Sequence, residues 1–175
     1  MIDELQPDDA TVIAPRPSVF TAVQQHWQKH AGEWQLDLDV PGTGGLLVLR
    51  TRPIESRALA TLLDRINTSK DPLSALNANV DLLVAATDAV LGRDRPGDTA
   101  TPTLDPDGDP YTIGTLAGPL GMNGARAREV CLRLFSGVPS PDLAIGQTAN
   151  EYIAWASGAN LDIDASTVGE SPAGG

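Results

Sequence analysis

Residues 71–92 read DPLSALNANVDLLVAATDAVLG, and this stretch decides the fold. Asp71 is suited to cap a helix, Pro72 suits the first helical position, and Gly92 suits the position after the last turn. Between them, large apolar side chains recur three and four positions apart, while alanines fill most of the opposite side. The pattern predicts a helix over residues 72–91 with neighbours on more than one side, the central helix of a small helical domain. Two Asp and two Asn interrupt the apolar residues, which is not typical of a membrane span.

A β-hairpin is predicted upstream of this helix, at about residues 34–51. Polar and apolar residues alternate over residues 34–40, as they do in a half-buried strand. Residues 41–45, PGTGG, are typical of a turn, and a second extended run follows them. The spacing of apolar residues also predicts helices at residues 18–30 and 55–67.

The chain after the central helix alternates between irregular and helical segments. Residues 92–124 are rich in Gly and Pro and predict a long irregular loop. Within it, we expect a small ribbon around Asp107-Gly108 and one helical turn at residues 115–120. Two amphipathic helices are predicted after the loop, at residues 125–135 and 141–157.

The expected fold is therefore mainly α within the α+β class. Residues 1–17 are acidic and contain three prolines, so they predict a flexible arm. Residues 18–158 are expected to form a single helical domain that includes the hairpin and the long loop. Residues 159–175 end in GESPAGG and predict a disordered tail.

The composition restricts the partners of the chain. It has 175 residues, enough for one domain with a sizeable core, and a net charge of −11. Binding to phosphates needs a basic surface, so nucleic acid is not an expected partner, and neither is an anionic membrane. A basic or apolar protein partner fits better. Cys131 is the single cysteine, so no internal disulfide is expected, and the acidic N-terminus predicts no signal peptide.

Two patterns resemble metal sites. His26 and His30 stand one helical turn apart, as some zinc ligands do, but no Cys or acidic residue stands at a fitting distance. Asp105, Asp107 and Asp109 resemble the start of a calcium loop, but its sixth position is proline instead of glycine and its twelfth is not glutamate. A solvated helix face and an acidic turn are the favoured interpretations.

No pattern predicts an enzyme. Cys131 falls on the apolar side of its helix with nothing to place a histidine beside it, which favours a buried structural thiol. Residues 42–45 read GTGG but belong to a hairpin turn, and no phosphate loop, dinucleotide fingerprint or G-x-S-x-G motif occurs. We therefore predict no catalytic, cofactor-binding or metal-binding residues and no cofactor.

Some side chains have both a structural and a functional interpretation. Phe135, Tyr152 and Trp155 are suited to anchor a partner, but their helical spacing favours packing in the core. Two arginine pairs are more typical of solvated edges than of sites, and they would form a site only if they met Arg126 and Arg133 on one surface: Arg50 with Arg52, and Arg93 with Arg95. An enzyme would most readily arise from Asp81 and Asp88 facing Arg126 or Arg133 in a closed cavity, although a structural ion pair is favoured there.

Seven segments follow one another in an order that resembles one protein family. They are RTRP (50–53), NVDLLVAAT (79–87), GRD (92–94), DGDPY (107–111), LAGPLGM (116–122), AREVCLRLF (127–135) and NEYIAW (150–155). In order and spacing they resemble the tail assembly chaperones of long-tailed bacteriophages that infect actinobacteria. The resemblance covers about residues 46–157.

This resemblance implies a function in virion morphogenesis and no enzymatic activity. Such chaperones bind the tape measure protein, keep it soluble in the cytoplasm of the bacterial host, and are absent from the mature virion. The family also implies a longer form made by programmed frameshifting, so that this chain would be the short form. We expect contacts with copies of the chain and with the longer form. The alternative is a structural virion component of the head–tail connector or tail terminator type, and a small enzyme is the third alternative.

Overall fold

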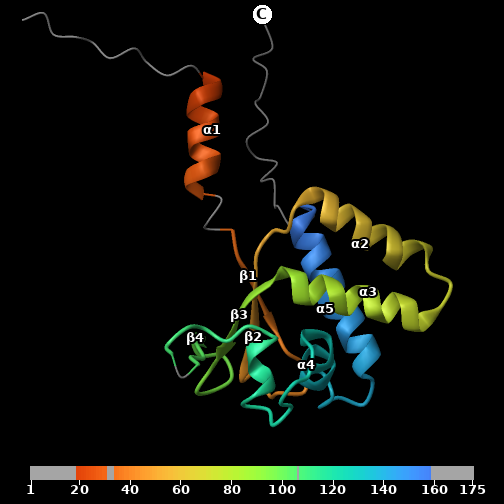
Figure 1. Ribbon diagram of the computed structural model, residues 1–175. Coiled ribbons are helices and arrows are strands. Elements are labelled where there is room, and N and C mark those ends of the chain that lie inside the picture. The colour runs from red at the N-terminus through yellow and green to blue at the C-terminus, as the bar shows by residue number, and fades with distance from the viewer. Residues whose placement is uncertain (1–18, 31–33, 106, 159–175) are drawn as a thin grey trace, which may run out of the picture. The chain divides into compact units, whose positions relative to one another are not determined.

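The computed structural model describes residues 19–30, 34–105 and 107–158 (Figure 1). The arm predicted over residues 1–17 and the tail predicted over residues 159–175 lie outside this part of the chain. The chain divides into two units between Trp34 and Gln35. The first unit contains α1 (Val19–His30), which confirms the predicted first helix. The domain predicted over residues 18–158 spans this division.

The second unit combines helices with an antiparallel sheet. Its described helices are α2 (Ser56–Thr68), α3 (Pro72–Ala86), α4 (Ala127–Leu134) and α5 (Pro141–Ala156), with a short 3-10 helix, η1 (Thr115–Ala117). Its strands are β1 (Leu36–Asp39), β2 (Leu47–Thr51), β3 (Thr87–Gly92) and β4 (Thr101–Pro102), which lie in the order β1-β2-β3-β4. The described residues therefore have an α+β fold. The helices predicted at 55–67, 125–135 and 141–157 are confirmed, with small shifts at their ends.

The prediction of one helix over residues 72–91 is wrong after Ala86. The helix begins where expected, because the Asp71 carboxylate caps its first turn and accepts the N–H of Ser74 over 3.0 Å. It ends at Ala86, and Thr87 begins β3 with no loop between the helix and the strand. The structure therefore divides the predicted helix into a helix and a strand.

Residues 87–92 form a strand that is buried on both faces of the sheet and paired with β2. Val90 joins the core beneath the helices, whereas Ala89 and Leu91 join a second buried cluster on the opposite face. A short apolar run fits a helix and a strand covered on both faces equally well. Pairing with β2, which is distant in sequence, decides between them. Gly92 consequently ends a strand instead of a helix.

The hairpin predicted at residues 34–51 is confirmed and supplies two strands of the larger sheet. β1 and β2 pair antiparallel across the predicted turn, and β2 also pairs antiparallel with β3. The register between β2 and β3 shifts between Arg50 and Thr51, which leaves Asp88 as the extra residue of a bulge.

The segment predicted as a long irregular loop, residues 92–124, is partly regular. β4 pairs with the end of β3, and Leu104 forms a bridge with Pro110. This ribbon confirms the one predicted around residues 107–108, and it turns at Gly108, where φ is +94°. The helical turn predicted at residues 115–120 is confirmed by η1.

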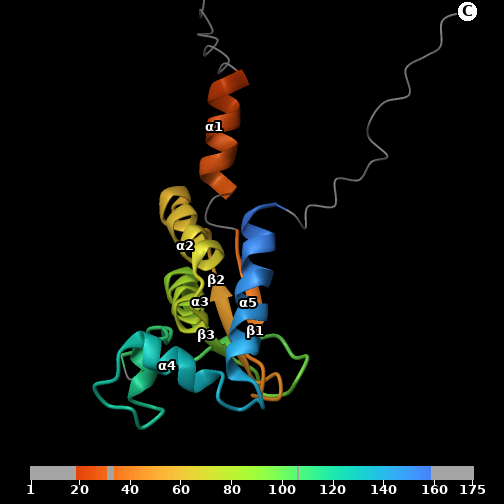
Figure 2. The same cartoon turned by 90° about the vertical axis from the view of Figure 1, so that its right-hand side faces the viewer.

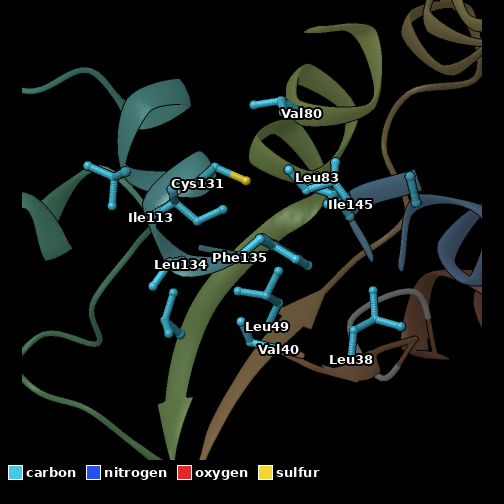
Figure 3. Close-up of a cluster of buried hydrophobic side chains, with 14 of the residues drawn as sticks. Leu38, Val40, Leu49, Val80, Leu83, Ile113, Cys131, Leu134, Phe135 and Ile145 are labelled. Atoms are coloured by element: carbon cyan, nitrogen blue, oxygen red, sulfur yellow. The ribbon is translucent and has the colours of Figure 1, made fainter. Parts of the chain in front are cut away.

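Helices cover one face of the sheet, and α3 lies against α2, α4 and α5 (Figure 1, Figure 2). The main core lies between these helices and the sheet (Figure 3). Its buried side chains include Leu38, Val40, Leu49, Val80, Leu83, Ile113, Cys131, Leu134, Phe135 and Ile145. The second, smaller cluster of Val48, Ala89 and Leu91 lies on the other face of the sheet.

Two glycines bring the β1–β2 turn against the linker between α4 and α5. A Cβ atom at Gly42 would lie 2.7 Å from the carbonyl carbon of Gly137. A Cβ atom at Gly137 would lie 2.7 Å from the carbonyl oxygen of Gly42. Gly42 also has a φ of +83°, which disfavours other residues. This contact therefore requires glycine on both sides.

Candidate functional site

An apolar groove lies between the N-terminal parts of α3 and α5. Its volume is about 550 Å³, within the range of roughly 300–1,000 Å³ that is usual for ligand sites. Leu73 is 63% exposed and Leu143 is 62% exposed, so two leucines border the groove with most of their surface in water. The lining comprises Pro72, Leu73, Ala75, Leu76 and Asn79 of α3 together with Asp142 and Leu143 of α5.

Two polar side chains give the groove its electrostatic character. Asp142 is exposed in the first turn of α5. Asn79 Oδ1 is buried and has no hydrogen-bond partner among the described residues. The lining contains no Lys or Arg, so the groove is apolar with a carboxylate at its border.

The residues at which α3 and α5 begin determine where the two walls of the groove start. Both helices begin with proline, and Asp71 and Ser140 occupy the capping positions before them. α3 and α5 then pack against each other. The side chain of Asn79 lies beside Gly146, where a Cβ atom would be 3.8 Å from Asn79 Nδ2. Asn79 therefore lies against the backbone of α5 at Gly146.

The sequence patterns do not predict this groove. Leu73 falls on the apolar arc of the predicted central helix, which indicates burial, but in the structure it lies exposed in the first turn of α3. Leu143 is the informative residue, because it falls outside the apolar half of its helix. A large apolar residue away from the buried face of a helix is exposed, and it indicates a partner surface only where other apolar residues lie beside it.

Of the two patterns that resemble metal sites, the structure describes one. His26 and His30 belong to α1, but their side chains lie outside the described part. Asp105 Oδ1 accepts the N–H groups of Asp107 over 3.0 Å and Asp109 over 2.9 Å, so this carboxylate closes an acidic turn. Among the side chains that the structure describes, no group of three or more His, Cys, Asp or Glu is placed to hold a metal ion.

The Cys131 thiol lies in the core, and the prediction of a buried thiol is confirmed. Burial raises the pKa of the thiol to about 12, because the apolar surroundings disfavour the thiolate. The thiolate is the nucleophilic form of cysteine. The thiol is therefore in its unreactive form at neutral pH.

Arg50, Arg52 and Arg93 each form an ion pair with an aspartate. Arg126 and Arg133 lie at α4, whereas three other arginines pair with aspartates at the sheet. The side-chain hydrogen bond with Asp37 raises the pKa of Arg50. The three arginine–aspartate ion pairs are Arg50 with Asp37 at 2.9 Å, Arg52 with Asp88 at 3.0 Å and Arg93 with Asp39 at 2.7 Å.

Asp81 takes different partners from those considered in the sequence. It accepts Arg65 Nη1 of α2 over 3.2 Å and Arg128 Nε of α4 over 3.0 Å. The expected ion pair of Asp81 with Arg126 or Arg133 is therefore wrong in its partners, because α3 turns Asp81 towards α2 and the exposed side of α4. The structural interpretation is correct, since Asp81 joins three helices.

The aromatic side chains pack as core residues. Phe135 and Tyr152 are fully buried, and Trp155 is half-buried against the core. The ring centroids of Tyr152 and Trp155 are 5.8 Å apart. The Tyr152 hydroxyl donates to the carbonyl of Arg52 over 3.0 Å and accepts the N–H of Ile54 over 3.2 Å. The preferred interpretation of these aromatics as core residues is confirmed.

The groove is suited to apolar contact with one ionic interaction at its border. Asp142 is the titratable residue among its lining. Within the described part of the chain, no helix combines the length and the apolar character needed to cross a membrane. Comparison of the chain with protein families, curated proteins and solved structures finds no match.

Proposed function

We propose that the protein is the short form of a tail assembly chaperone from a long-tailed bacteriophage that infects actinobacteria. It binds the tape measure protein and keeps it soluble while the tail is assembled. It catalyses no reaction, acts in the cytoplasm of the bacterial host and is absent from the mature virion. Copies of the chain and a frameshifted longer form contact it during assembly.

The groove between α3 and α5 is the observation that carries this proposal. A chaperone covers apolar side chains of its client, and two exposed leucines beside an apolar groove offer a surface for that contact. Burial of apolar area contributes roughly 25 cal/mol per Å² before the costs of association. A contact confined to this groove is small, and small interfaces are typically transient. Transient binding suits a protein that leaves before the virion is complete.

The sequence supports the same proposal through the order of its segments. NVDLLVAAT and AREVCLRLF, two of the segments that carry the resemblance, map onto α3 with the start of β3 and onto α4. The proposal takes α3 as the central helix of a mainly helical scaffold. The net charge of −11 would help to keep a complex with an aggregation-prone client in solution.

Co-expression with the tape measure protein of the same phage tests the proposal. We expect the tape measure protein to become soluble and to co-purify with the chain. The double variant Leu73→Gln/Leu143→Gln should recover less of it, since both leucines border the groove. Leu104→Gln is the matched control. Leu104 is 54% exposed, but it lies away from the groove, on the ribbon that continues from β4 to the bridge between Leu104 and Pro110 (the β4 ribbon). A tape measure protein that stays insoluble with the wild-type chain would overturn the proposal.

Mass spectrometry of purified virions separates the chaperone from the structural alternative. A head–tail connector or tail terminator remains in the finished particle, whereas a chaperone does not. We expect no peptides of this chain in mature virions and abundant peptides in the lysate of infected cells. Peptides present in virions in fixed proportion to the tail proteins would favour the structural component.

A further inference from the structure

The groove between α3 and α5 has apolar walls and one carboxylate. Leu73, Leu76 and Leu143 are the leucines of its lining, and Asp142 is its charged residue. Grooves between helices commonly take the apolar face of an amphipathic helix, whose side chains three and four residues apart enter the groove. The apolar lining therefore indicates the apolar face of a helix as the occupant.

The charge of the chain indicates what flanks that apolar face. The net charge is −11, and the groove contains Asp142 without any Lys or Arg in its lining. A second copy of the chain in the groove would bring another net charge of −11 next to the Asp142 carboxylate, which electrostatic repulsion opposes at this surface, so the contacts between copies in the proposed function would use other surfaces. A segment with Lys or Arg beside its apolar face is attracted instead.

We propose that the groove binds a basic amphipathic helix of the client polypeptide. The apolar side chains of this helix pack between Leu73 and Leu143, and a Lys or Arg on its flank pairs with Asp142. The inference rests on the proposed function, because it names the chemistry of the client segment that the same groove receives.

Two labelled peptides test the need for an amphipathic helix. Both contain only Leu and Lys in the same numbers. In one peptide the leucines form a single helical face, and in the other their order is scrambled. Fluorescence anisotropy with the full-length protein measures both affinities. We expect the amphipathic peptide to bind at least about tenfold more tightly, because only it presents a continuous apolar face.

Glutamine variants test the place of binding without changing the charge of the protein. Leu73→Gln and Leu143→Gln remove apolar surface from the groove, so each should lower the affinity for the amphipathic peptide by about tenfold. Leu104→Gln makes the same change on the β4 ribbon and should leave the affinity within about twofold. Circular dichroism checks that each variant keeps its helical content.

A second pair of variants tests the ionic contact. Asp142→Asn removes the carboxylate at the groove, and Asp98→Asn removes the same charge from an exposed position between β3 and β4. We expect Asp142→Asn to lower the affinity for the amphipathic peptide by about threefold to tenfold and to reduce the salt dependence of binding. Asp98→Asn should have little effect on either quantity.

Three results would overturn the inference. One is that the wild-type protein, Leu73→Gln and Leu143→Gln bind the amphipathic peptide with equal affinity, which would indicate general attraction of a basic peptide to an acidic protein. Another is an equal effect of Asp142→Asn and Asp98→Asn. The third is a wild-type dimer in light scattering that Leu143→Gln converts to a monomer, because a second copy would then occupy the groove.

The peptide and co-expression experiments can fail separately. If the peptide binds at the groove but the tape measure protein is never recovered, the proposed function fails and the chemistry of the groove stands. If the tape measure protein is recovered equally well by the wild-type chain and by both leucine variants, the function stands and the inference about the groove fails.

Discussion

Arg93 Nη1 lies 2.7 Å from Asp39 Oδ1, although the two residues are 54 positions apart in the chain. The pair connects the residue after β3 with the end of β1, across the intervening strand β2. The Arg93 side chain is only 17% exposed, whereas that of Asp39 is 63% exposed. Arg93 also donates to the carbonyl of Gly45 over 3.4 Å. One guanidinium thus fastens the first hairpin to the third strand.

Asp39→Asn tests the contribution of this pair to stability. The substitution removes the carboxylate and leaves the largely buried guanidinium of Arg93 without its counter-charge. Because Asp39 is mostly in water, we expect the free energy of unfolding to fall by only about 0.5–1 kcal/mol at low salt. Urea unfolding at low and high salt measures this, and high salt should shrink the difference. Asp98→Asn is the control, and an equal loss there would contradict the importance of the pair.

Tyr152→Phe tests the attachment of α5 to the segment between β2 and α2. The tyrosine hydroxyl donates to Arg52 and accepts from Ile54, so its removal leaves both backbone groups without this partner. We expect a loss of about 1–3 kcal/mol in the free energy of unfolding, measured by urea denaturation. Tyr111→Phe, at a half-buried position, is the matched control and should cost less.

Burial also raises the pKa of Tyr152, which makes a prediction about alkaline pH. A group whose pKa is higher in the folded state stabilises the fold below its unfolded pKa, and this contribution is lost as pH rises through the folded pKa. The wild-type protein should therefore lose more stability than Tyr152→Phe above about pH 10. Parallel pH profiles of the two proteins would contradict this expectation.

Gly42→Ala tests the close approach of the two glycine backbones. An alanine Cβ would lie 2.7 Å from the carbonyl carbon of Gly137, and the φ of +83° adds backbone strain. We expect a loss of more than about 2 kcal/mol, measured by urea or thermal unfolding. Gly44→Ala shares a positive φ, +66°, but its Cβ would meet no atom within 4 Å, so it should cost only about 1 kcal/mol. Equal losses would show that the contact with Gly137 is unimportant.

Cys131 should resist thiol reagents as long as the protein is folded. Its pKa of about 12 and its complete burial both suppress reaction at about pH 8. A disulfide reagent whose reaction is measured by absorbance should react slowly with the native protein. In urea it should react with one thiol per chain. The raised pKa also predicts a loss of stability between about pH 9, the ordinary value, and about pH 12. Rapid labelling of the native protein would place the thiol at the surface.

Local chemistry predicts the helix starts and the turns well. Asp71 caps α3 as expected, Pro141 begins α5, and the glycine-rich residues 41–45 connect β1 to β2. Each of these features depends on interactions within a few residues, so the sequence pattern alone is informative. The strand at residues 87–92 is different, because its conformation depends on pairing with β2.

The groove and the ion pairs also lie beyond local patterns. Asp81 meets Arg65 and Arg128 only because α2, α3 and α4 pack together. Leu73 and Leu143 border one groove only because α3 and α5 lie side by side. A sequence pattern assigns each leucine to a helix face, but it does not say which helix ends meet.

The direct passage from Ala86 to Thr87 makes the length of the chain critical at this point. One inserted residue would turn every position of α3 before it by about 100° relative to the strand, or would exchange the two faces of β3. In the second case Val90 would leave the helical side, and Ala89 and Leu91 would enter it. We expect natural variants to differ in length in the segments between β3 and α4, and to keep the helix–strand junction at constant length.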